Sequence, residues 1–79
     1  MKKAIIWTKE KCSYCDKAKD LFKKHDIAYD EYIIGKTVTK EDLLKKVPTA
    51  KSVPQIFINN EHIGGYDELV KYMEKQNAI

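Results

Sequence analysis

Two cysteines separated by two residues, Cys12 and Cys15, are the side chains of this sequence best suited to redox chemistry. At this spacing on a helix, two sulfurs lie on one side and can form and break a disulfide. Cysteines in such motifs ionise with pKa values between about 3.5 and 7.5, compared with about 8.5 for a free thiol. We therefore expect a reactive dithiol in which Cys12 attacks and Cys15 resolves the mixed disulfide.

The residues around the motif indicate which sulfur attacks. Apolar side chains recur at helical spacing over 13–24, so the cysteines stand at the start of a helix. There Cys12 faces unpaired backbone N–H groups and the positive end of the helix dipole, and both stabilise a thiolate. Lys9 and Lys11 add positive potential. Cys15 lies deeper and points back along the helix, as suits a resolving thiol.

Instead of redox chemistry, the cysteines could have a structural role, either as zinc ligands or as a permanent disulfide. A zinc site needs about four ligands, and the remaining candidates, His25 and His62, are too far apart in the sequence for a zinc-finger arrangement. A permanent disulfide would close so short a loop that it would constrain the unfolded chain little. Such disulfides are also rare in reducing compartments.

Composition and charge disfavour several other classes of protein. Fifteen lysines oppose twelve acidic residues, for a net charge of +3, and the two signs are interleaved without any arginine. A nucleic-acid partner is therefore not expected. The apolar run 4–7 is too short for a signal sequence and no longer run follows, so we expect a cytoplasmic protein with no membrane segment. A chain of 79 residues predicts one domain over 1–79, which we expect to be a monomer.

The elements that must hold the dithiol follow from hydrophobic spacing and turn residues. Strands are predicted over 3–8, 27–34, 55–58 and 61–63, and helices over 13–24, after Thr39 as far as Pro48, and from Asp67 onward. Asn59 and Asn60 form the turn of a hairpin. The order is βαβαββα, and a Cys-X-X-Cys motif between the first strand and helix of a βαβ unit strongly indicates redox function.

Three motifs in register resemble the glutaredoxin family over nearly the whole chain. They are Thr8–Cys15, Ser52–Ile58 and His62–Asp67. The resemblance implies an α/β, thioredoxin-like fold with a four-stranded mixed sheet flanked by three helices. It also implies a glutathione-dependent oxidoreductase that reduces protein disulfides and glutathione-mixed disulfides. Ribonucleotide reductase is a substrate suggested by family analogy alone.

The first motif carries the family's reacting groups. Cys12 resembles the nucleophile, Cys15 the resolving thiol and Tyr14 the aromatic residue beside the bound tripeptide. Lys9 resembles the basic residue that faces a glutathione carboxylate, and a solvated lysine is the alternative for that position without the resemblance.

The other two motifs carry the rest of the glutathione site. Ser52, Val53 and Pro54 resemble a segment in which a cis proline leaves the preceding backbone free to pair with glutathione as an added strand. The alternative for Pro54 is an ordinary turn proline. A segment formed by Gly65, Tyr66 and Asp67 resembles the one that holds the γ-glutamyl end. Asp67 is also a candidate helix cap, and the two roles are compatible.

Two residues depart from the usual family pattern, since Ser13 stands where proline is common and Ser52 where threonine is usual. Some family members with the motif Cys-Ser-Tyr-Cys, as in this chain, bind a [2Fe–2S] cluster between two subunits. A cluster carrier, ligated by Cys12 of two chains and two glutathiones, is therefore an alternative function, and no obligatory metal is expected. A thioredoxin-like protein served by a flavin reductase is a third, although Lys11 replaces the tryptophan usual there.

Overall fold

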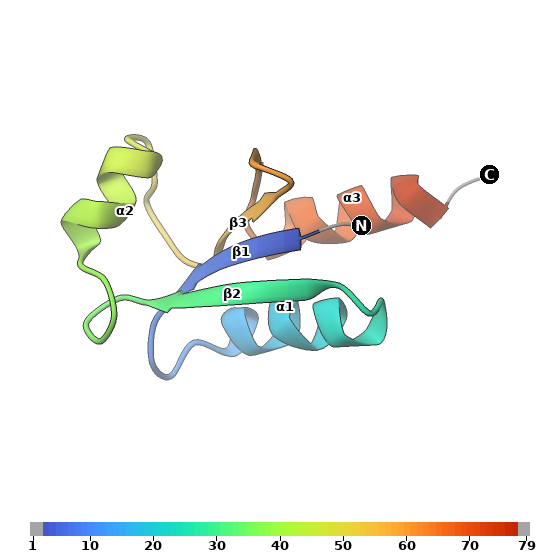
Figure 1. Cartoon of the computed structure of the whole chain (residues 1–79), viewed down its shortest axis with the longest axis horizontal. Helices are drawn as coiled ribbons and strands as arrows, with labels where there is room; N and C mark the ends of the chain where they lie inside the picture. Colours follow the sequence, from blue (N-terminus) through green and yellow to red (C-terminus); the bar gives the residue numbers. More distant parts are fainter. Residues whose placement is uncertain (1–2, 78–79) are drawn as a thin grey trace.

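A computed structural model describes residues 3–77 of the chain (Figure 1). The elements are β1 (Lys3–Thr8), α1 (Ser13–Lys24), β2 (Ala28–Ile33), α2 (Lys40–Lys46), β3 (Gln55–Ile58), β4 (Glu61–Gly64) and α3 (Tyr66–Asn77). The strands form one sheet in the order β2-β1-β3-β4, in which β1 pairs parallel with β2 and antiparallel with β3. The predicted element order and four-stranded mixed sheet are confirmed.

Alternation along β1 divides the core between the two faces of the sheet. Ala4 and Ile6 are fully buried against α1 and α3, where they form one cluster with Phe22 of α1 and Leu69 of α3. On the opposite face, Trp7 packs in a second cluster with residues of α2. Because successive side chains of a strand point to opposite faces, this one central strand supports both helical layers. Figure 1 shows α2 at one end of the molecule, away from α1 and α3.

Helix α2 begins where the sequence predicts. The hydroxyl of Thr39 accepts a hydrogen bond from the Asp42 N–H at 3.1 Å, and the Asp42 carboxylate accepts one from the Thr39 N–H at 3.0 Å. This reciprocal capping box satisfies two N–H groups that the helix itself leaves unpaired. The same backbone contact helps to lower the pKa of the Asp42 carboxyl.

Three predicted boundaries differ from the structure. The second strand runs over Ala28–Ile33 and not 27–34, because the Ile27 N–H donates to the Phe22 carbonyl at the end of α1. Strand β4 extends to Gly64, and α3 begins one residue before Asp67. Gly64 has φ of +122°, and a Cβ there would lie 2.9 Å from Cγ of Glu68, so both backbone and space require glycine.

The hairpin turn is confirmed, since Asn59 and Asn60 both have positive φ, 51° and 69°.

None of the helices within 3–77 combines the length and apolarity needed to cross a membrane.

Candidate active site

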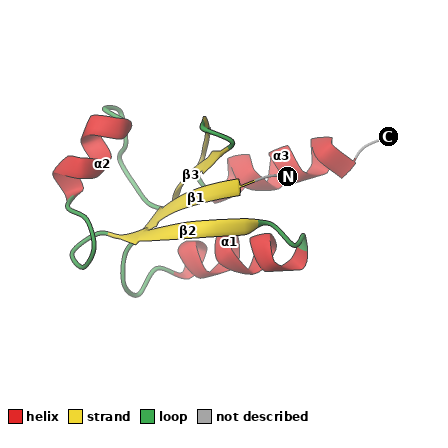
Figure 2. Cartoon of the chain, viewed as in Figure 1, coloured by secondary structure: helices red, strands yellow, loops and turns green. Residues whose placement is uncertain are grey.

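Two loops meet at the end of the sheet where β1 finishes and β3 starts (Figure 2). The antiparallel register pairs Trp7 with Gln55, so the segment after β1 and the segment before β3 are neighbours. Cys12 lies in the first segment and Val53 in the second. The Cys12 sulfur is 4.0 Å from the carbonyl oxygen of Val53.

Cys12 is the N-cap residue of α1, and its sulfur accepts a hydrogen bond from the Cys15 N–H at 3.2 Å. The two cysteines are joined as a disulfide with their Cα atoms 5.2 Å apart. Cys15 is 1% exposed, whereas Cys12 is half-buried. After reduction, a thiolate on Cys12 would therefore find a backbone donor and the helix N-terminus already in position.

A cleft beside the cysteines brings together seven of the eight residues predicted to bind glutathione. It has a volume of about 350 Å³ and is lined by Tyr14, Ser52, Val53, Pro54, Gly65, Tyr66, Asp67 and Glu68. The Val53–Pro54 peptide bond is cis. The rings of Tyr14 and Tyr66 have centroids 5.9 Å apart, and Tyr14 is 55% exposed, so the cleft offers an aromatic wall open to a ligand.

Lys9, the eighth predicted residue, does not line this cleft. It lines a neighbouring hollow that shares Ser52 and Val53 with the cleft. An extended ligand paired with Val53 could contact both hollows.

Two roles were considered for Asp67, helix capping and ligand binding, and the structure at the start of α3 distinguishes them. The Gly65 N–H donates to the Glu68 carboxylate at 2.8 Å, so Glu68 caps the helix and the expectation of a cap at Asp67 is wrong. The Asp67 side chain is exposed and makes no hydrogen bond or ion pair within the described part of the chain. Its carboxylate is therefore available to a cationic group of a ligand.

Gln55 supports the segment before β3, and sequence reasoning did not single it out. Its amide donates to the Ser52 carbonyl oxygen at 2.9 Å, and its side-chain oxygen lies 2.9 Å from Nε2 of His62. Since the amide oxygen can only accept, His62 donates this bond. The signal in the sequence was a polar residue at the start of the apolar run that follows Pro54. In the structure Gln55 is only 8% exposed. His62, considered above as a metal ligand, is occupied here as a hydrogen-bond donor.

A charged network under α1 holds the helix to the sheet. The buried Thr8 hydroxyl donates to Glu31 at 2.8 Å, and Lys19 lies 2.9 Å from the same carboxylate and 3.6 Å from Asp16. Burial raises the pKa of Glu31, but the hydrogen bonds from Lys19 and Thr8 outweigh it and the net pKa is lowered. The hydrogen bond to Glu31 raises the pKa of Lys19. Asp16 directly follows Cys15, so this network helps to fix the first turn of α1.

Within residues 3–77, no group of three or more His, Cys, Asp and Glu side chains is arranged to hold a metal ion.

Comparison with known proteins identifies the family. The glutaredoxin family model matches residues 4–63. Glutaredoxin 1 of Rickettsia prowazekii is 40% identical over 77 residues, covering 95% of this chain and 80% of that protein. The crystal structure of glutaredoxin 1 from Francisella tularensis superposes with a TM-score of 0.83 at 35% identity, covering 96% of each chain. A buckwheat glutaredoxin–glutathione complex superposes with a TM-score of 0.80 at 25% identity, covering 92% of this chain and 69% of that one.

These relatives confirm the predicted thioredoxin-like fold and the predicted reaction class. The chain belongs to the glutaredoxin family, whose members are glutathione-dependent disulfide oxidoreductases.

Proposed function

We propose that residues 1–79 work as one glutaredoxin domain in which Cys12 is the nucleophile, Cys15 the resolving thiol and the adjoining cleft the glutathione site. The observation that carries the proposal is the position of the Cys12 sulfur. It accepts the Cys15 N–H at 3.2 Å and lies 4.0 Å from the backbone of Val53, which lines the cleft.

The exchange needs only the two thiols and a disulfide. The Cys12 thiolate attacks one sulfur of the substrate, forms a mixed disulfide with it and releases the other substrate sulfur as a thiolate, which takes up a proton. Cys15, deprotonated, then attacks the Cys12 sulfur, which forms the Cys12–Cys15 disulfide and releases the second substrate thiol. Two electrons pass from the dithiol to the substrate. Two glutathiones reverse the change and leave as oxidised glutathione.

Glutathione fits the cleft by its chemistry. It is a peptide-like ligand with two carboxylates and one ammonium group, so it requires backbone pairing, cations and an anion. Val53 offers the backbone, Asp67 an unpaired carboxylate for the γ-glutamyl ammonium, and Lys9 an ammonium group for a carboxylate. Tyr14 and Tyr66 flank the ligand, and Ser52, Pro54 and Gly65 complete the walls. The bound glutathione of the buckwheat relative supports the same use of this chain.

The test is a coupled assay of disulfide reduction with glutathione and glutathione reductase, compared with thioredoxin reductase as the donor. We expect glutathione to be preferred. Asp67→Lys should raise the KM for glutathione about 3- to 10-fold, because an exposed ion pair becomes a repulsion. Glu74→Lys, an equal charge change at an exposed position farther along α3, is the matched control.

The rate of Cys12 alkylation by a small neutral reagent should not change in Asp67→Lys, because the carboxylate does not contact the sulfur. If alkylation and glutathione use fell together, Asp67 would be structural. If neither changed, the γ-glutamyl site would lie elsewhere. Efficient reduction by thioredoxin reductase with none by glutathione would contradict the proposed donor.

We propose a cytoplasmic monomer whose substrates are disulfide-bearing proteins, with ribonucleotide reductase suggested by family analogy alone. The second candidate, a carrier with a [2Fe–2S] cluster between two chains, is motivated by Ser13 in the Cys-X-X-Cys motif. Brown colour in freshly purified protein would favour the carrier.

A further inference from the structure

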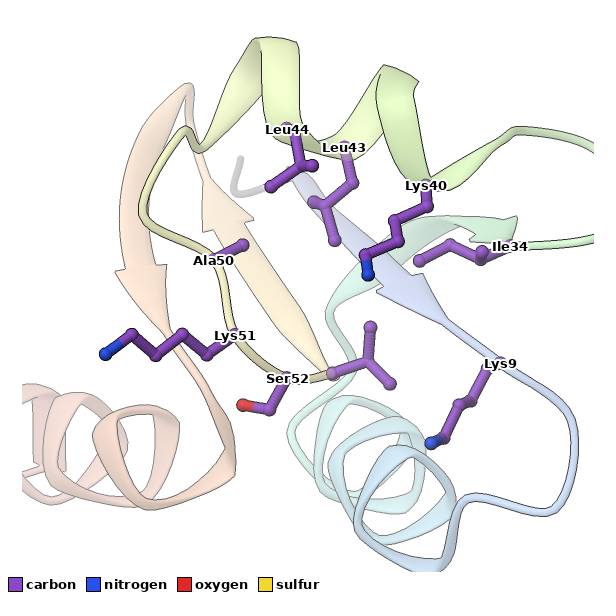
Figure 3. Close-up of a pocket in the computed structure, with 9 residues that line it drawn as sticks. Lys9, Ile34, Lys40, Leu43, Leu44, Ala50, Lys51 and Ser52 are labelled. Atoms are coloured by element: carbon purple, nitrogen blue, oxygen red, sulfur yellow. The ribbon is translucent and has the colours of Figure 1, made fainter.

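The hollow next to the cleft, shown in Figure 3, has a more apolar and more basic lining than the cleft. Its volume is about 260 Å³. Much of the lining is apolar and comes from Ile34, Leu43, Leu44, Ala50 and Val53. Glutathione has no large apolar side chain, so these residues call for a different kind of ligand group.

Three lysines, Lys9, Lys40 and Lys51, also line this hollow, which we call the lysine groove. In Figure 3, Lys40 reaches from α2 toward the middle of the groove, Lys9 stands on the far side, and Lys51 extends outward from the rim. Among residues 3–77, no Asp or Glu lines the groove.

The charge of these lysines is not neutralised by the described part of the chain. None of the three makes an ion pair there, whereas Lys3, Lys19 and Lys36 each lie within 3.2 Å of a carboxylate oxygen. Three unpaired cations around an apolar lining produce a local positive potential, which attracts a ligand that carries carboxylates.

The groove is within reach of the reacting sulfur. Ser52 and Val53 line both the groove and the cleft, and the Val53 carbonyl is 4.0 Å from the Cys12 sulfur. A polypeptide held to Cys12 by a mixed disulfide can therefore pass over Val53 and place its neighbouring residues in the lysine groove.

We propose that the lysine groove docks the polypeptide of a protein-disulfide substrate, and that it selects a segment in which an apolar residue and acidic residues lie next to the reactive cysteine. The apolar residue packs on the lining and the carboxylates meet the lysines. This inference rests on the proposed function, because it assumes that Cys12 attacks the substrate disulfide. A nucleic acid would use the lysines but not the apolar lining.

The test uses disulfide-bridged peptides and a small glutathione-mixed disulfide as substrates of the full chain. One peptide has a leucine and two aspartates beside its reactive cysteine, a second has lysines for the aspartates, and a third has serine for the leucine. We expect kcat/KM for the acidic peptide to exceed that for the basic one at least about tenfold at low salt, which corresponds to about 1.4 kcal/mol. High salt should reduce this preference, and the serine peptide should be a poorer substrate than the leucine peptide.

The variant Lys40→Glu/Lys51→Glu should lose the preference for the acidic peptide. Its control is Lys45→Glu/Lys71→Glu, which changes the net charge equally at exposed positions outside the groove. Both variants should reduce the small glutathione-mixed disulfide as the wild type does. In a mixed disulfide between Cys15→Ser protein and the acidic peptide, amide chemical shifts of Leu44 and Ala50 should change.

The outcomes separate the two proposals. If the wild type did not reduce the small glutathione-mixed disulfide at all, the proposed function would be overturned, and the proposed docking with it. Normal activity toward the small substrate, with no preference between the peptides or with a preference that survives Lys40→Glu/Lys51→Glu, would overturn the docking alone. Tighter binding of a short DNA duplex than of the acidic peptide would assign the groove to nucleic acid and also overturn it.

Discussion

The pKa of Cys12 in the reduced protein follows from its position at the start of α1. The perturbation is Cys15→Ser, which leaves a single thiol but keeps the backbone N–H that reaches the Cys12 sulfur at 3.2 Å in the oxidised protein. A hydrogen bond to a charged group contributes about 1.5–3 kcal/mol, and a helix N-terminus about 0.3–1 kcal/mol. Because the sulfur is half-buried and partly screened by water, we use about 2–3 kcal/mol for the two together.

This stabilisation of the thiolate converts into a pKa. At about 1.36 kcal/mol for each pKa unit, this stabilisation should hold the pKa of Cys12 well below that of a free thiol. The assay is the rate of alkylation as a function of pH, measured for the folded variant and for the same variant unfolded in guanidinium chloride. A folded midpoint equal to the unfolded one would show that the start of α1 does not stabilise the Cys12 thiolate.

The same pKa difference predicts how the stability of the reduced protein depends on pH. Because the folded pKa is the lower one, the thiolate's contribution is fully present above the unfolded pKa and is lost as the pH falls through the folded pKa. Urea denaturation of Cys15→Ser and of Cys12→Ser/Cys15→Ser at several pH values measures this contribution. The difference between the two variants should grow as the pH rises.

Two further predictions concern residues that support the site. Glu31 has a lowered pKa in the folded chain, so its contribution to stability is lost as the pH falls through that pKa. Glu31→Gln should therefore flatten the dependence of the melting temperature on pH in acid. The control variant Glu61→Gln should not. An unchanged acid dependence in Glu31→Gln would show that the network contributes nothing. Gln55→Leu removes the hydrogen bond to Ser52 and should lower the free energy of unfolding by about 1–2 kcal/mol in urea, more than His62→Phe does. Equal stability of Gln55→Leu and the wild type would contradict the supporting role of Gln55.

Much of the fold could be predicted because local signals and long-range packing agree. The continuous apolar run from Ala4 to Trp7 is typical of a buried strand, and β1 is indeed covered on both faces. Thr39 has the residue type of a helix cap, and its partner lies three residues along the chain. Such elements depend on neighbours in sequence, which a pattern can reveal.

The differences arise where a contact joins residues distant in sequence or where two residues compete for one role. Asp67 was the expected cap of α3, and only the geometry shows that its neighbour Glu68 accepts the Gly65 N–H. The bond from Gln55 to the Ser52 carbonyl depends on how the chain turns at the cis peptide bond. The lysine groove combines side chains from loops and a helix that no local pattern connects.

The proposed mechanism assigns attack to the Cys12 sulfur and resolution to the Cys15 sulfur, and a comparison of two single variants tests this assignment. Cys12→Ser and Cys15→Ser should be assayed side by side with a glutathione-mixed disulfide and with a protein disulfide. Cys12→Ser should show no turnover of either substrate, because the half-buried sulfur at the helix start is the nucleophile. Cys15→Ser should still reduce the glutathione-mixed disulfide and lose most of its activity toward the protein disulfide. Substantial activity in Cys12→Ser together with none in Cys15→Ser would contradict the assignment and make Cys15 the attacking residue.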